Sequence, residues 1–306
     1  MAEAASKKTE PAAADDRTFT PTAASKRQST RLRVIAWILW IVAIAAEAVG
    51  IFWVLRQRET TTSSGQLVRN PDTGLLEPVT APGFPQWAFI VLIVLLVVIA
   101  ALSITGSFLW KKANRLDPAS AKDKVRFFVQ NQLGAIVAIV AFLPLIIMVF
   151  LNKDMSGSQK TIAGIIGIVL AAGSVALGAD FNPPSQEAYS AEKSTVIQLL
   201  GADSVAWAAG GEVYHVCPEV SDLANANAVS TGTVAEAIAA GKPRLTLELR
   251  SELTQCGKPV PDNVSEITDA IRAIRDGAVD TVLPAPVWPA GVEAPFTPAE
   301  PAPAAS

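Results

Sequence analysis

The stretch WAFIVLIVLLVVIAALSITGSFLW, residues 87–110, decides the fold class of this 306-residue chain. It contains no charged residue, and it is longer than the roughly 20 residues that a helix needs to cross a bilayer. A helix that is apolar on every side belongs in a membrane or deep inside a large protein. We therefore interpret this stretch as a transmembrane helix.

Three further apolar segments resemble it in length, at residues 34–55, 133–151 and 161–179. The last two could instead be buried helices of a soluble domain, but the first two leave few alternatives to a membrane. Charged residues make up only 17% of the chain, whereas soluble domains carry about 25%. The sequence thus predicts an α-helical membrane bundle of about four transmembrane helices within residues 33–180.

The polar segments around the bundle differ in character. Residues 1–32 are basic and have no apolar core, so we expect a disordered tail and no cleavable signal peptide. Residues 284–306 are rich in Pro and Ala, which predicts an extended, unstructured tail. The first loop, 56–86, contains NPDTG and APGFP, which indicate turns and not a folded domain.

Residues 183–283 have a mixed pattern that predicts a small α+β domain. We expect a helix over 185–200, a hairpin formed by 205–208 and 212–216, and a strand over 245–249. Two Ser/Thr/Asn-x-x-Glu pairs, typical of capping boxes, predict two more helix starts. These pairs are Thr233 with Glu236 and Asn263 with Glu266, and the helices they open should end at Gly241 and Gly277.

Basic residues are concentrated on alternate loops, which predicts the orientation. The N-terminal tail carries seven and the central loop six, whereas the two remaining loops carry three and two. These residues are Lys7, Lys8, Arg17, Lys26, Arg27, Arg31 and Arg33; Lys111, Lys112, Arg115, Lys122, Lys124 and Arg126; Arg56, Arg58 and Arg69; and Lys153 and Lys160. The positive-inside rule places the N-terminus in the cytoplasm, and four crossings return the C-terminal domain there.

Five tryptophans lie towards the ends of the first two segments, where amphipathic rings prefer the headgroup level of the bilayer. They are Trp37, Trp40, Trp53, Trp87 and Trp110. Lys111 and Lys112 follow directly, and their long side chains can reach the interface.

Glu47 is the ionisable residue inside the first apolar segment, on one helix face with Ala43 and Gly50. A carboxyl group at that depth costs a few kcal/mol, so it is a candidate for handling protons or cations, or for contacting another subunit. The alternative is a protonated or hydrogen-bonded side chain with a structural role. We favour the structural role, because no second intramembrane charge is present to form a relay.

Small residues recur every four positions in the fourth segment, at Ala163, Gly167 and Ala171. This spacing lets helix backbones approach closely, either within the chain or against a partner, and packing within the chain is the simpler interpretation. Pro144 should kink the third segment, because it removes a backbone donor.

Chemistry-bearing residues are few in the domain. Cys217 and Cys256 are a candidate disulfide that would close a loop of about 40 residues, and the alternative is two reduced core cysteines. His215 and Cys217 provide too few ligands for structural zinc, so we expect no metal site. No phosphate-binding loop, dinucleotide fingerprint or nucleophile elbow is visible, so we expect neither an enzyme nor a cofactor. A net charge of -3 argues against a nucleic-acid partner.

Several motifs resemble those of uncharacterised actinobacterial multi-pass membrane proteins with a compact C-terminal module. They are ADFNPPS at 179–185, VYHVCPEVSDL at 213–223, GTVAEAIAAGKPRLTLEL at 232–249 and QCG at 255–257. The resemblance implies a shared module but no activity.

The module also resembles a shorter unit of extracytoplasmic bacterial proteins, in which cysteines and a histidine suggest a metal site. Val220, Thr246 and Leu249 occupy the cysteine positions here, so the resemblance implies a retained fold without that site. It also favours an oxidising, external side, as a disulfide would. A re-entrant third or fourth segment would reconcile this with the charge bias, but we favour the cytoplasm.

From these features we expect a non-enzymatic integral membrane protein of the cell membrane, a scaffold or accessory subunit of a membrane assembly. Its partners would be the lipid bilayer and other membrane subunits, a respiratory-type complex being one candidate. The alternative is a small transporter or ion-handling protein that uses Glu47.

Overall fold

The structure is a computed structural model that describes residues 18–278 and 280–296, without the side chains of residues 61–66 and 77–82. These residues form two compact units. The first, which we call the bundle, comprises residues 27–114 and 125–183. The second, which we call the composite domain, is built from three separate segments, of which the structure describes 18–26, 115–124 and the residues from 184 onwards.

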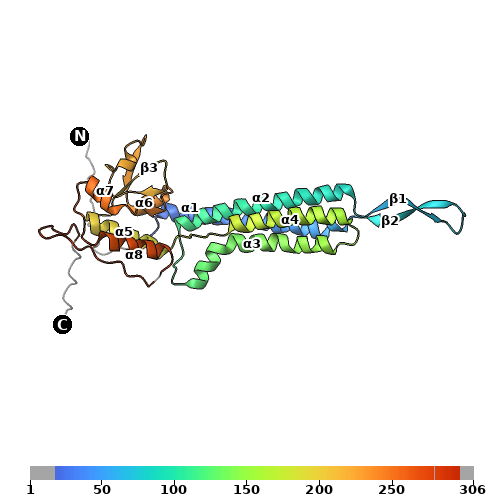
Figure 1. Ribbon diagram of the computed structural model, residues 1–306, viewed down its shortest axis with the longest axis horizontal. Coiled ribbons are helices and arrows are strands. Elements are labelled where there is room, and N and C mark those ends of the chain that lie inside the picture. Colours follow the sequence, from blue (N-terminus) through green and yellow to red (C-terminus); the bar gives the residue numbers. More distant parts are fainter. Residues whose placement is uncertain (1–17, 279, 297–306) are drawn as a thin grey trace, which may run out of the picture. The chain divides into compact units, whose positions relative to one another are not determined.

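Four long helices run alongside one another in the bundle (Figure 1). They are α1 (Ala23–Phe52), α2 (Gln86–Leu116), α3 (Lys124–Leu151) and α4 (Gly157–Gly178), and α1 is followed by the short 3-10 helix η1 (Val54–Arg56). Among the described residues, these four helices are long and apolar enough to cross a membrane, which confirms the predicted fold class. Helices α1 and α3 begin well before their predicted apolar cores, at Ala23 and Lys124, and α2 continues past its core to Leu116, because polar helix-forming residues continue the backbone pattern.

The first loop contains a β-hairpin that the sequence did not predict. Strand β1 (Glu59–Arg69) pairs antiparallel with β2 (Leu76–Gly83), and the hairpin projects from one end of the bundle (Figure 1). The NPDTG motif forms the turn, with Gly74 at a φ of 71°. The interpretation of the loop as turns alone was therefore wrong, because runs of Thr favour an extended backbone even beside Gly and Pro.

At the hairpin end of the bundle, the connections contact one another. Arg58 forms an ion pair with Asp154 at 2.6 Å, and the Asn152 side chain donates to the carbonyl of Leu55. The backbone N–H of Phe84 donates to the carbonyl of Asp154 at 2.8 Å. The α1–α2 and α3–α4 connections therefore meet at one end of the four helices.

Two of the five tryptophans are buried within the protein and do not face outward as expected of interfacial anchors. Trp40 is fully buried and Trp110 nearly so, whereas Trp37, Trp53 and Trp87 are about half exposed. The indole N–H of Trp40 donates to the carbonyl of Ser103, and that of Trp110 donates to the carbonyl of Gln130. These two rings lie inside the bundle because each finds a backbone acceptor there. Lys111 likewise donates to the carbonyl of Ala179 at 2.5 Å.

The composite domain is an α+β fold with short strands. Its helices are α5 (Gln186–Leu200), α6 (Val234–Ala239), α7 (Leu249–Gln255) and α8 (Val264–Arg275), with the 3-10 helix η2 (Ser221–Leu223). Strand β3 (Val205–Ala208) pairs antiparallel with β5 (Val229–Gly232), and β4 (Val213–Tyr214) pairs parallel with β6 (Arg244–Leu245). Helices α5 and α8 contact each other, and the apolar faces of α5, α7 and α8 share one core with β3 and β6.

Three local predictions for this domain needed correction. The expected hairpin is a single bridge between Ala206 and His215, because β3 takes β5 as its main partner. The expected strand over 245–249 stops at Leu245, and Leu249 instead begins α7. The Thr233–Glu236 capping box is present, but Asn263 does not cap α8 with its side chain. That side chain bonds to Ala285 and Val287 in the C-terminal segment, a tertiary contact that competes with the local one.

The N-terminal segment is part of the composite domain. Residues 1–17 lie outside the described residues, but 18–32 contradict the predicted disordered tail. Phe19 is buried in the main core and packs edge-on against Tyr189, with ring centroids 4.9 Å apart. Its backbone N–H donates to the Ser190 hydroxyl at 3.0 Å. One aromatic residue is thus enough to fix a segment that is otherwise polar.

The connection between α2 and α3 also folds into this domain, at the start of α5. The Glu187 carboxylate accepts hydrogen bonds from the Ser120 hydroxyl at 2.5 Å and from the backbone N–H of Ala121 at 2.7 Å. The backbone N–H of Gln186 donates to the carbonyl of Ala119, and the Tyr189 hydroxyl donates to that of Arg115. The domain therefore combines chain from before α1, between α2 and α3, and after α4.

The C-terminal segment up to residue 296 has no helix or strand, as predicted, but it does not extend freely. Leu283 and Trp288 pack against the main core of the domain. The backbone N–H of Asp262 donates to the carbonyl of Val287 at 2.8 Å. The predicted unstructured tail is therefore wrong for residues 284–296, and residues 297–306 lie outside the described part of the chain.

Candidate functional site

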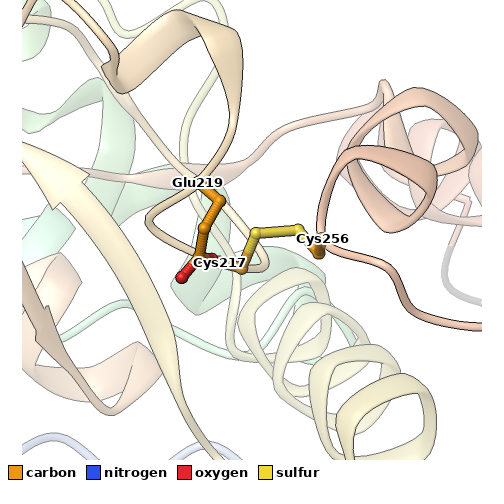
Figure 2. A group of neighbouring side chains, drawn as sticks. All are labelled: Cys217, Glu219 and Cys256. Atoms are coloured by element: carbon orange, nitrogen blue, oxygen red, sulfur yellow. A yellow bond between two sulfur atoms is a disulfide. The ribbon is translucent and has the colours of Figure 1, made fainter.

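Cys217 and Cys256 are joined in a disulfide, with their Cα atoms 6.2 Å apart (Figure 2). Cys217 follows β4, and Cys256 directly follows α7. The bond therefore links two segments that are 39 residues apart in sequence. This is the pair that the sequence proposed, and the separation of the Cα atoms lies in the range that a disulfide requires.

The same two segments carry a buried pair of chemistry-bearing side chains. His215 Nδ1 lies 2.6 Å from the Glu252 carboxylate, and both side chains are at least 95% buried. The second carboxylate oxygen of Glu252 accepts a hydrogen bond from the backbone N–H of Val216 at 3.1 Å. A carboxylate that accepts from Nδ1 orients the imidazole and leaves Nε2 as its second functional atom.

Next to this pair lies a pocket of about 540 Å³. His215 and Asp222 are the titratable residues that line it, and Asn225 and Asn227 supply amide groups. The turn over residues 208–213 also contributes to its lining, and the buried ammonium of Lys242 donates to the carbonyls of residues 209–211 in this turn. The pocket is therefore bordered by backbone that side chains of the domain hold in place.

The sequence did not predict this arrangement. His215 was considered only together with Cys217, because both occur in one short motif. Glu252 lies 37 residues further on, in a helix that was not predicted. The one available signal was the position of each residue relative to a cysteine of the candidate disulfide. His215 is two residues before Cys217, and Glu252 is four residues, or one helical turn, before Cys256, so a disulfide would bring the two side chains near each other.

A second buried network, around Glu192, has a structural role. The Glu192 carboxylate accepts hydrogen bonds from the Tyr214 hydroxyl, from the backbone N–H of Leu245 at 2.9 Å and from Arg275 at 2.6 Å. Complete burial raises the pKa of Glu192, although Arg275 and the other donors oppose this. Burial and the adjacent Glu192 raise the pKa of Tyr214 well above its usual value. The network joins α5, β4, β6 and α8, and it does not open into the pocket described above.

In the bundle, Glu47 is buried and accepts a hydrogen bond from the backbone N–H of Leu145 at 3.3 Å. Leu145 follows Pro144, the proline inside α3. A proline loosens the helix around it, so a side-chain acceptor beside it has a clear structural use. This contact matches the structural interpretation of Glu47.

The small-residue face of α4 packs within the bundle. Ala163 and Gly167 are buried and Ala171 is partly buried in the main bundle core. A Cβ added at Gly167 would lie 3.0 Å from Ile146 of α3. A closer approach, which the sequence did not predict, lies between Gly134 and Gly178, where an added Cβ at Gly178 would be 2.7 Å from the backbone of Gly134.

Comparisons with known proteins add no relative. No family model matches the chain, and neither the curated proteins nor the solved structures gave a match.

Proposed function

We propose that this chain is a non-enzymatic integral membrane protein that serves as a scaffold or accessory subunit of a membrane assembly. The observation that carries the proposal is the construction of the composite domain from three segments. Its core includes Phe19 from before α1, and the start of α5 holds residues 119–121 between α2 and α3. A domain that gathers three separate segments of the chain into one fold is suited to presenting a binding surface to partner subunits.

The same observation bears on membrane topology. Segments that fold into one unit must lie on one side of the membrane, and here they adjoin the start of α1, the end of α2, the start of α3 and the end of α4. Four full crossings satisfy this condition, whereas a re-entrant third or fourth segment does not. We place the domain in the cytoplasm, because the tail and central loop carry thirteen basic residues and the other two loops carry five.

Reporter fusions test this orientation. A reporter fused at residue 120 should indicate the cytoplasm, and one fused at residue 70 the outside. Thiol trapping in intact cells provides an independent reading of the compartment. The disulfide of this structure persists only in an oxidising compartment, so in the cytoplasm Cys217 and Cys256 should be reduced and alkylated without prior reduction. An external reporter at 120 together with an oxidised pair would invert the topology.

The scaffold role is tested by mild extraction from native membranes, followed by native gels and mass spectrometry. The chain should migrate in a complex with other membrane subunits, and an actinobacterial respiratory-type complex is one candidate. Glu187→Ala, which removes the acceptor for Ser120 and Ala121, should weaken that association, whereas the exposed Glu266→Ala should not. A solitary chain under several mild detergents would count against the proposal.

The alternative is a transporter or ion-handling protein that uses Glu47. The contact with Leu145 favours a structural role, because it gives the carboxyl group a partner within the bundle. Glu47→Gln separates the two. It keeps an acceptor for the N–H group but cannot exchange a proton, so any ion-dependent phenotype should disappear only if the alternative holds.

A further inference from the structure

The strongest unassigned feature is the pocket beside His215. His215, Asp222 and Glu252 each offer one ligand atom, and these atoms lie within 4.8 Å of one another. The residues come from three different places, namely the segment after β4, the 3-10 helix η2 and helix α7. Sequence proximity alone does not explain this convergence, because 37 residues separate His215 from Glu252.

We propose that His215, Asp222 and Glu252 form a binding site for a divalent transition-metal cation, of which Zn²⁺ is the representative ion. One imidazole and two carboxylates are a ligand set that Zn²⁺ accepts, and the imidazole disfavours Mg²⁺ and Ca²⁺. With neutral imidazole, the two carboxylates balance the charge of the cation. The proposal is independent of the scaffold role.

The burial of the cluster is suited to such a site. His215 and Glu252 are buried and fixed by each other and by the N–H of Val216, so two of the ligands are preorganised. Asp222 is exposed on η2, so its side chain can rotate the short distance needed to reach metal–oxygen contact of about 2 Å. Water in the pocket would complete a four-coordinate site.

The cation would lie between His215 Nδ1 and the Glu252 carboxylate, in place of the hydrogen bond that joins them. A ligand nitrogen must carry no proton, so the neutral imidazole would bind the cation through Nδ1 and keep its single proton on Nε2. The bound cation would also fasten the loop over residues 222–228 to α7. One contact of this kind is already present, because the backbone N–H of Ser221 donates to the side chain of Gln255 in α7 at 2.7 Å. Bound Zn²⁺ should therefore raise the unfolding temperature of the domain.

A second cluster of side chains that could bind a metal lies close by, and the experiment must distinguish it from the first. Cys217, Glu219 and Cys256 also converge, but in this structure the disulfide occupies both sulfur atoms (Figure 2). Reduction of the disulfide by a dithiol would free two thiolates, which bind Zn²⁺ strongly. The experiment therefore needs the disulfide intact, and Glu219→Gln provides the matched control.

The test is titration of the metal-free, full-length protein in detergent with Zn²⁺ by calorimetry, with the disulfide verified by mass spectrometry. Asp222→Asn should weaken binding by at least about tenfold and reduce the rise in unfolding temperature at a fixed Zn²⁺ concentration, whereas Glu219→Gln should change neither. Asp222 is exposed, so its variant should fold normally. Co²⁺ substituted for Zn²⁺ should give a spectrum without the intense thiolate charge-transfer band.

Either of two results would overturn the proposal. One is an absence of Zn²⁺ binding to the oxidised wild-type protein. The other is binding that appears only after reduction, is weakened by Glu219→Gln and shows the thiolate band with Co²⁺, which would assign the metal to the cysteines.

Discussion

The bundle and the composite domain differ in where they place large apolar side chains and charged groups. The bundle exposes large apolar side chains such as Ile38, Ile41 and Val169 and buries small residues, indoles and a few polar groups. The domain encloses an apolar core and also a buried ion pair, between Glu192 and Arg275. Lipid gives apolar side chains no reason to cluster, so helices in it are held by close packing. In water, burial of apolar surface holds the fold, and buried charges must be paired.

The largest expected effect tests the paired charges of the domain. Arg275→Ala leaves the carboxylate of Glu192 buried without its counter-ion, which should cost about 3–5 kcal/mol. Hydrogen exchange measured by mass spectrometry should show lost protection in α5 and α8, with the bundle helices unchanged. Arg272→Ala is the matched control, because Arg272 pairs with Asp269 on the exposed face of the same helix. Equal effects of the two variants would contradict the distinction between buried and surface pairs.

Close backbone packing in the bundle is tested by Gly178→Ala. The new Cβ would lie 2.7 Å from the backbone of Gly134, and backbone cannot move aside as a flexible side chain can. We expect α3 and α4 to separate slightly, at a cost of about 1–3 kcal/mol in unfolding by SDS titration followed by circular dichroism. Gly173→Ala, in the same helix, meets no atom within 4 Å and should be neutral or stabilise the helix. If Gly173→Ala also destabilised the bundle, the cost would come from replacing any glycine of α4, and not from the close approach of the two backbones at Gly178.

A smaller effect is expected for Glu47, an ionisable residue within the apolar part of the bundle. Glu47→Leu should insert normally, because it removes a polar group from the membrane. It should nevertheless lower bundle stability by about 1 kcal/mol in the same titration, since the N–H of Leu145 loses an acceptor. Glu47→Gln retains an acceptor and should lie closer to wild type. A more stable Glu47→Leu variant would remove the structural role assigned to this residue.

The smallest effect concerns Glu187, which fastens the central loop to α5. Partial burial acts to raise the pKa of Glu187, but hydrogen bonds from Ser120 and Ala121 outweigh it and lower the pKa. Its contribution is therefore fully present above the usual pKa of a glutamate and is lost as the pH falls through the lowered value. Glu187→Gln should reduce protection of the loop by about 1 kcal/mol or less near neutral pH. In the variant, loop protection should lose this pH dependence, and an unchanged profile would contradict the assignment.

The sequence by itself determined the elements whose physics is local. Residues 87–110 have to be a helix, because only a helix or a closed barrel satisfies the backbone in lipid, and no strand pattern is present. The helix over Gln186–Leu200 and the capping box at Thr233 were likewise predicted, because a cap and an apolar period involve only nearby residues.

Only the tertiary structure decided the features that join distant residues. Phe19 occurs in a polar segment that composition describes as disordered, and it is ordered by a ring 170 positions further along the chain, Tyr189. Asn263 has the sequence of a helix cap, but its side chain bonds to Val287 instead. Gly134 and Gly178, and likewise His215 and Glu252, become partners only when their elements pack. No periodicity within one element encodes such pairs, because their free energy comes from contacts that exist only in the folded chain.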